Sequence, residues 1–100
     1  MLNINKTKEN EVLTVALEGR LDTTTAPQLD ADIKDSLDGV DSVVLDMKDL
    51  EYISSAGLRV LLSAQKIMNQ RGGMVLRNVN EIVNEIFEVT GFSEILNIEE

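Results

Sequence analysis

Two adjacent serines, Ser54 and Ser55, are the side chains of this sequence best placed to do chemistry. They follow Tyr52-Ile53 and come directly before Ala-Gly-Leu and further leucines, where a helix is expected to begin. A serine at such a position commonly caps the helix, because its side-chain oxygen accepts one of the amide hydrogens that the first turn leaves unpaired. One serine suffices for a cap, so the second is either a small residue in a tight turn or a regulatory phosphoacceptor.

The chain contains no cysteine and no histidine. Serine-histidine-aspartate hydrolysis, cysteine nucleophiles, zinc sites built on thiolate or imidazole, and histidine acid-base catalysis are therefore excluded. An enzyme that used Ser55 as its nucleophile would lack a histidine base and would have only distant lysines to replace it. We expect a non-enzymatic protein with no cofactor and no metal site.

The formal net charge is −9, from 9 basic and 18 acidic residues. Nucleic-acid phosphates and anionic membranes both require basic patches, so neither is expected as a direct partner. No apolar run approaches the ~20 residues of a membrane span, and the N-terminal segment has no signal-peptide core. The sequence predicts a cytoplasmic protein, without membrane insertion, that prefers basic or apolar partner surfaces.

Asp46 suggests a rival interpretation, because it ends the apolar run 43–45 as the phosphoacceptor of a receiver domain ends a buried strand. A receiver also needs an acidic pair after its first strand and a lysine after a later one. Here Leu17 is followed by Glu18-Gly19-Arg20, and no lysine follows Lys66. An isolated match without its context is weak, so we favour an Asp46 that accepts hydrogen bonds from nearby loop amides.

The elements that must position the serines can be inferred from the spacing of apolar residues. Alternation over 2–4 and 13–17 predicts an antiparallel hairpin whose first strand lies at the edge of a sheet. The period then becomes helical from about Ala26, and Thr25 and Gln28 have the spacing of a capping box. The continuous apolar run that ends at Asp46 predicts a short central strand covered on both faces.

The second half of the chain repeats the alternation of helix and strand. A helix is expected from Ala56 to a stop at 71–73, followed by a strand over 74–79. Asn80 then caps a third helix that Gly91 closes, and 94–98 adds a short strand or a turn. The expected buried face of this third helix consists of Ile82, Val83, Ile86 and Phe87.

Strands that alternate with helices imply right-handed crossovers and a mostly parallel sheet. The sequence therefore predicts one small α/β domain over residues 1–100. Its mixed sheet has four or five strands with an N-terminal hairpin, and three or four helices pack against it.

This order of elements resembles the anti-sigma factor antagonist family, whose module is the STAS domain (sulphate transporter and anti-sigma factor antagonist). The resemblance covers nearly the whole chain and rests on "EGRLDTTTAPQL", "VVLDMKDLEYISSAGLRVLL" and "NEIVNEIFEVTGF". Its most specific part is a hydrophobic strand, then Asp-Leu near Tyr-Ile, then a serine before a Gly-Leu helix start.

In that family, the serine two residues before this glycine is phosphorylated by a partner kinase that is also the anti-sigma factor. The resemblance places that role on Ser55, with Ser54 as the second candidate. It implies a bacterial phosphoprotein that acts in signal transduction by partner switching. The unmodified protein would bind the kinase, and the phosphorylated protein would be released from it. This exchange would control sigma-factor-dependent transcription. A phosphatase is a further candidate partner.

The resemblance also implies a partner-binding face formed by the "GRLD" loop, the serine turn and the start of the following helix. Arg59 is either an ordinary solvated arginine or the partner of a phosphate four residues earlier. Leu58 and Leu62 either form an exposed apolar patch or pack in the core. The candidate face consists of Asp22, Thr23, Thr24, Thr25, Tyr52, Ile53, Ser54, Ser55, Ala56, Gly57, Leu58, Arg59 and Leu62.

A second hypothesis keeps the same fold without the switch. The chain would then be a STAS subunit of a larger transport or signalling assembly, in which Ser54 and Ser55 only contact a partner. The two hypotheses differ in whether Ser55→Asp abolishes binding.

Overall fold

A computed structural model describes residues 1–99 as one α/β domain of two layers. The elements in chain order are β1 (Leu2–Glu9), β2 (Val12–Leu21), α1 (Ala26–Asp35), β3 (Ser42–Ile53), α2 (Ser55–Met68), β4 (Met74–Arg77), α3 (Glu81–Thr90) and a short 3-10 turn, η1 (Phe92–Glu94). The expected α/β class, hairpin and helix order are confirmed, with four strands and three α-helices in the described part.

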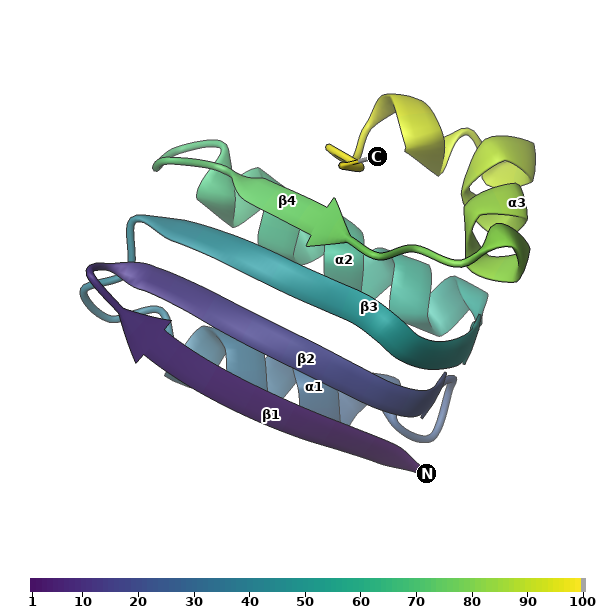
Figure 1. Cartoon of the computed structure of the whole chain (residues 1–100), viewed down its shortest axis with the longest axis horizontal. Coiled ribbons are helices and arrows are strands. Elements are labelled where there is room, and N and C mark those ends of the chain that lie inside the picture. The colour runs from purple at the N-terminus through teal and green to yellow at the C-terminus, as the bar shows by residue number, and fades with distance from the viewer. Residues whose placement is uncertain (100) are drawn as a thin grey trace.

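The four strands follow one another in space as β1-β2-β3-β4. β1 pairs antiparallel with β2 and lies at the edge as expected, whereas β2, β3 and β4 are parallel. Figure 1 shows α1 and α2 side by side behind the sheet, and α3 at the right-hand end. Both crossover helices follow the carboxyl end of a strand, so α1 and α2 begin at the same end of the domain.

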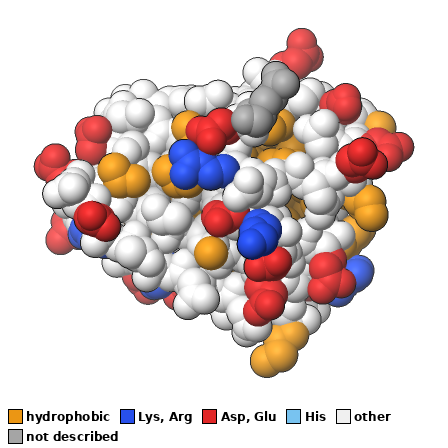
Figure 2. All heavy atoms as spheres, in the orientation of Figure 1, with side chains coloured by type: hydrophobic (Ala, Val, Ile, Leu, Met, Phe, Trp, Pro, Cys, Tyr) orange, Lys and Arg blue, Asp and Glu red, His pale blue; other side chains and the backbone are white. Residues whose placement is uncertain are grey.

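The core lies between the sheet and the helices, and it is aliphatic. Val15 and Leu45 of the sheet and Leu61 of α2, for example, are fully buried. Burial alternates along β3, where Val43 and Leu45 are buried but Val44 is only half-buried. The expectation of a strand covered on both faces is therefore wrong, because helices cover one face of the sheet and leave the other open (Figure 2).

The strand β3 is also longer than expected, since it continues past Asp46 to Ile53. Its pairing with β2 shifts register between Ala16 and Glu18, which marks an irregularity just beyond Asp46. Lys48 and Asp49, which follow the expected strand end at Asp46, are exposed residues within the strand. Irregular pairing of this kind lets a strand continue through a local break in its apolar alternation.

Three local expectations about helix ends are tested by the structure. The capping box at Thr25 is wrong, because the Thr25 side chain makes no cap hydrogen bond to α1. Asn80 caps α3 as expected, accepting from the Val83 amide at 2.8 Å, and Gly91 ends α3 in the left-handed conformation. The second helix begins one residue earlier than expected, at Ser55.

In the C-terminal segment, one expectation is wrong and one is confirmed. Ile82, expected in the buried face of α3, is 62% exposed, whereas Val83 and Phe87 are fully buried. Of the two alternatives expected for 94–98, the turn is correct, and a single bridge then joins Ile98 to Leu76 at the outer edge of β4. This bridge covers part of the edge of β4, which would otherwise expose unpaired backbone groups.

Candidate functional site

The two serines have different structural roles at the start of α2. Ser54 is the N-cap residue, with extended backbone, and its hydroxyl accepts a hydrogen bond from the Gly57 amide at 3.4 Å. Ser55 is the first residue of the helix, and its side chain is exposed. The first serine, Ser54, is thus the cap, and the second serine, Ser55, has the exposed hydroxyl.

Pairing between the ends of β2 and β3 brings the loop after β2 beside the serine turn. Leu21 pairs with Ile53, and the Ser54 amide donates to the Leu21 carbonyl at 2.9 Å. One residue pair earlier, the Arg20 guanidinium lies 4.5 Å from the centre of the Tyr52 ring, a cation-π contact. Arg20 was not among the expected site residues, although its place in the "GRLD" segment was an available signal.

The loop 22–25 is held in one conformation by Asp22 and Thr25. The Asp22 carboxylate accepts from the amides of Thr24 and Thr25 at 3.0 and 3.1 Å. Thr25 Oγ1 donates to the Arg20 carbonyl at 2.9 Å and accepts from the Asp22 amide, also at 2.9 Å. The amide of Thr25, above all, lowers the pKa of Asp22 because it stabilises the carboxylate. Asp22 is therefore ionised near neutral pH and orders the loop.

Burial divides the thirteen expected face residues into two groups. Thr25, Ile53, Gly57 and Leu58 are buried. They therefore pack beneath the exposed residues of the face and support them. For Leu58 the core-packing alternative is correct, while Leu62 is half-buried. The exposed or half-buried residues of the face are Asp22, Thr23, Thr24, Tyr52, Ser54, Ser55, Ala56, Arg59 and Leu62.

Gly57 lets α2 approach the sheet closely at the serine turn. A Cβ at this position would lie 2.7 Å from Leu21 Cγ and 2.9 Å from Ile53 Cγ1. Both distances are shorter than real side-chain contacts, so a larger residue would push the start of α2 away from β2 and β3. The glycine that marks the family motif therefore fixes the height of Ser55 above the sheet.

A shallow groove of about 390 Å³ lies between α1 and α2, next to the serine turn. Thr23, Ala56 and Arg59 of the expected face line one part of it. Residues that the sequence did not indicate complete it: Ala26, Pro27, Asp30, Lys34, Val60 and Ser63. Their spacing predicted a helix but not which side of α1 would meet α2, so no local signal identified them.

The described residues contain no group of three or more acidic side chains placed to hold a metal ion. Asp46, considered above as a receiver phosphoacceptor, accepts from the Lys48 amide at 3.1 Å and from the Asn78 side chain at 3.0 Å. It lies inside β3, on the open face of the sheet, and not at a strand end. The favoured role, in which Asp46 accepts from loop amides after the strand, is met only in part, because the Lys48 amide lies within β3 and the second donor is the Asn78 side chain.

Fold and site together define a small α/β interaction module that presents an exposed serine at the start of a helix. Residues 3–100 match the STAS domain family. The chain belongs to this family, and within it to the anti-sigma factor antagonists, which are non-enzymatic regulators. Within the described residues, no helix is long and apolar enough to cross a membrane.

Two relatives match almost the whole chain. BtrV of Bordetella bronchiseptica, assigned as an anti-sigma factor antagonist, is 37% identical over 99 residues, covering 97% of this chain and 85% of BtrV. The anti-sigma F factor antagonist of Paenibacillus polymyxa is 31% identical over 100 residues, covering 97% of this chain and 86% of that protein. These similarities confirm the resemblance inferred from the motifs.

Solved structures confirm the fold. An anti-sigma factor antagonist from Mycobacterium paratuberculosis has a TM-score of 0.88 at 20% identity, covering 98% of this chain and 85% of that one. The phosphorylated form of SpoIIAA, a Bacillus cell fate determinant, has a TM-score of 0.75 at 18% identity, covering 98% of this chain and 92% of SpoIIAA. At these identities, the likeness is one of fold alone.

Proposed function

We propose that this chain is a partner-switching anti-sigma factor antagonist whose switch is Ser55. Unmodified, it binds an anti-sigma factor that is also a serine kinase, and so frees the sigma factor for transcription. Phosphorylation of Ser55 by that kinase releases the complex, and a phosphatase restores the binding form.

The observation that carries this proposal is the division of roles between the two serines. Ser54 supplies the N-cap of α2, so the Ser55 hydroxyl is exposed and has no structural duty. A kinase can therefore modify Ser55 without removing the cap. The relatives named as antagonists of anti-sigma factors support the regulatory role in which such a switch would operate.

A phosphate on Ser55 is compatible with the fold. The first turn of a helix carries partial positive charge and several unpaired amides, and Ser54 satisfies only one of them, that of Gly57. A group with roughly −1.5 to −2 charges is stabilised there. Arg59, exposed one turn further along α2, adds positive charge on the same flank. The phosphate therefore acts between molecules, by repelling or failing to fit a partner surface that accepts the hydroxyl.

The partner-binding face combines the exposed and half-buried residues of the loop, the turn and the start of α2. Thr23 and Thr24 lie on the loop that Asp22 orders, and Ser55 and Arg59 lie on α2. The groove between α1 and α2 gives this face a recess into which a partner side chain can insert. By analogy with interfaces of standard size, the face buries ~800 Å² on this chain.

Capture of partners from the native cell extract tests the switch. The baits are the wild-type chain, Ser55→Asp, and Gln70→Glu as a control that adds the same charge just beyond the other end of α2. We expect wild type and Gln70→Glu to retain an ATP-binding anti-sigma factor and Ser55→Asp to lose it, as identified by mass spectrometry.

Equal retention of one partner by all three baits would contradict the switch. The chain would then be a STAS subunit of a larger transport or signalling assembly, the alternative that the sequence left open. Loss of the partner by Gln70→Glu as well would show a general effect of charge, which also contradicts a role specific to Ser55.

A further inference from the structure

The outer face of α3 exposes apolar side chains that no other element of the described chain covers. Ile82 is 62% exposed and Val89 is 81% exposed, and Ile86 between them is half-buried. Their spacing of four and then three residues places all three along one stripe of the helix. A different face of α3 packs against the rest of the domain through Val83 and Phe87, which are fully buried. Ile86 packs in part against the core, whereas Ile82 and Val89 lie outside it.

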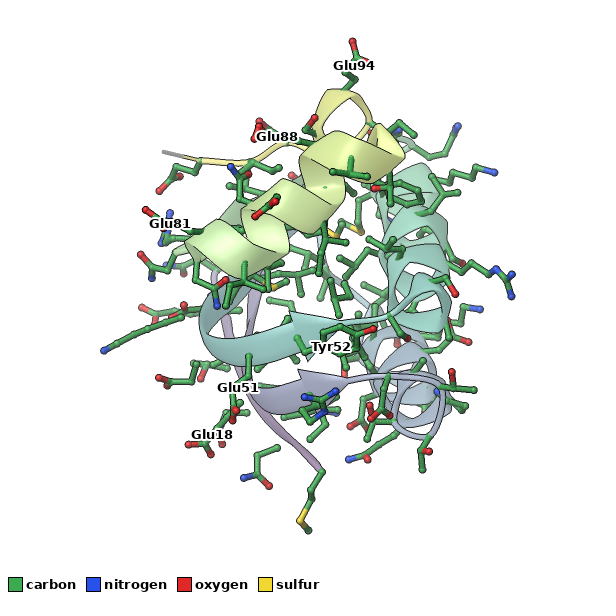
Figure 3. All side chains as sticks on the ribbon, turned by 90° about the vertical axis from the view of Figure 1, so that its right-hand side faces the viewer. Glu18, Glu51, Tyr52, Glu81, Glu88 and Glu94 are labelled. Carbon is green, nitrogen blue, oxygen red and sulfur yellow. The ribbon has the colours of Figure 1, made fainter. Side chains whose placement is uncertain are left out.

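A row of glutamates runs beside this stripe. Glu81, Glu85 and Glu88 are exposed and have the same spacing as the apolar residues, one position earlier in each case. At 100° per residue, the apolar stripe therefore lies between the acidic row and the buried face of α3. The segment 78–100 contains six glutamates and no lysine or arginine. Figure 3 shows Glu81 and Glu88 beside α3, which lies in front in this view, and Glu94 at the top of the molecule.

The stripe also contains a shallow groove. A groove of about 270 Å³ is lined by Ile82, Glu85, Ile86, Val89 and Thr90. The Thr90 hydroxyl donates to the Ile86 carbonyl at 2.7 Å, so its polar atom is occupied within the helix. The groove is therefore apolar in its floor and acidic along one rim. Figure 2 shows the hydrophobic and acidic side chains next to each other over α3, at the upper right.

Acidic charge continues beyond α3 along the end of the sheet. Ile82 also lines a second, polar groove of about 620 Å³ at the ends of β2 and β3. Glu18, Asp49 and Glu51 contribute three carboxylates to this groove, against the two basic side chains of Arg20 and Lys48. The surface around the exposed stripe is thus predominantly negative over more than one element.

This distribution of charge decides what can cover the stripe. A second copy bound symmetrically would bring the glutamate rows of both copies together, and anionic lipids or nucleic acid would be repelled in the same way. A protein segment with apolar side chains flanked by lysine or arginine can pack its apolar side chains on the floor of the groove and pair its basic side chains with the glutamates of the rim. Such a segment is recognised as an amphipathic helix in a groove, with anchors at helical spacing.

We propose that the outer face of α3 is a second docking surface for a basic, amphipathic protein segment. It is separate from the serine turn, although α3 and the start of α2 lie at the same end of the molecule (Figure 1). The surface does not depend on the state of Ser55. One partner can therefore occupy it while another exchanges at the serine turn.

The test uses the full chain labelled with 15N and a synthetic peptide, LKKLLKLLKKLLKL, as the probe at 150 mM NaCl. Backbone amide shifts locate the peptide and their titration gives Kd. The first variant is Ile82→Ser with Val89→Ser, and the second is Glu85→Gln with Glu88→Gln. The control is Asp35→Asn with Asp38→Asn, which removes two exposed charges elsewhere.

We expect the shifts to concentrate in 81–90, and the affinity to fall at least tenfold in the first variant and about fivefold in the second. The control should stay within twofold of wild type, and all variants should keep the wild-type spectrum outside α3. Shifts spread over the acidic surface, an equal loss in the control, or no binding at millimolar peptide would overturn the proposal.

Discussion

At the scale of single residues, each of three side chains in the site has a separate structural role. Ser54 caps α2, Asp22 orders the neighbouring loop, and Ser55 remains exposed with its hydroxyl available. Adjacent residues of the same type thus differ completely in what their loss should cost. That difference can be measured without any partner.

Ser54→Ala should destabilise the fold, because the Gly57 amide loses its acceptor. At 3.4 Å the hydrogen bond is long, so we expect the lower part of the range for N-caps, about 0.5–1 kcal/mol. Ser55→Ala and Ser55→Asp should leave Tm within about 2 °C of wild type, because substitutions of exposed residues that make no cap or core contact usually change stability little. Thermal unfolding followed by circular dichroism provides the measurement. A Ser55→Asp variant that melts several degrees below wild type would show that charge at this position damages the domain itself.

Asp22 should make stability depend on pH in the acid range. Its folded-state pKa lies below the ordinary value of 3.8, mainly because the Thr25 amide donates to it. The carboxylate therefore stabilises the fold above its unfolded pKa, and this contribution is lost as the pH falls through the folded pKa. Asp22→Ala should lower Tm at pH 7, and the gap to wild type should narrow between pH 4 and pH 2.

The control for Asp22 is Asp35→Ala, which removes an exposed carboxylate from α1. Its Tm should follow wild type at every pH. A gap for Asp22→Ala that stays constant from pH 7 to pH 2 would mean that the charge of Asp22 does not hold the loop.

At the scale of elements, the site depends on the close contact between α2 and the ends of β2 and β3. The contact is set by Gly57, which faces Leu21 and Ile53. Because the same two strands pair through Leu21 and Ile53, the loop after β2 and the serine turn are held next to each other. The position of Ser55 is therefore a property of three elements and not of its own loop.

Gly57→Ala should destabilise the protein even though alanine is the better helix former. The added methyl group would meet Leu21 and Ile53 at less than 3.0 Å, and overpacking of this kind costs about 1–3 kcal/mol. Combining it with Leu21→Ala, which opens space beneath the helix, should cost less than the sum of the two single changes. Chemical denaturation of the four proteins gives the coupling, and strict additivity would contradict the close contact.

The same elements show what the sequence could and could not predict. Apolar spacing located the hairpin, α1 and α3 because each carries an uninterrupted period, and Asn80 and Gly91 marked the ends of α3 correctly. It failed for β3, where an irregular pairing near Asp46 interrupts the alternation without ending the strand. It also placed Ile82 in the core, since periodicity shows that a residue is apolar but not whether a neighbour covers it.

The candidate site was predicted in part for a similar reason. The serine turn and the loop after β2 were found because their segments carry the family motif. The groove residues Pro27, Lys34 and Ser63 were missed, because they meet only when α1 and α2 lie side by side. The burial of Leu58 was left open, since it depends on the distance between α2 and the sheet that Gly57 sets.

At the scale of the whole molecule, a strongly acidic domain presents two surfaces at one end. The serine turn offers hydroxyls, a recess and Arg59, while α3 offers an apolar stripe beside glutamates. The net charge of −9 suits an approach to basic protein surfaces and speeds association with them at low ionic strength. A change of about two charges on Ser55 is small against that total. In the proposed switch, such a change would therefore act through the position of Ser55 in the partner-binding face and not through the overall charge.

The most direct test of the switch compares the chain with and without phosphoserine at position 55, installed during translation. The purified anti-sigma factor captured by wild type is titrated with both forms, and their thermal unfolding is recorded in parallel. We expect the affinity to fall at least 100-fold while Tm changes by less than about 2 °C. Equal affinities, or a loss of affinity that accompanies unfolding of the phosphorylated chain, would contradict a switch that acts between folded molecules.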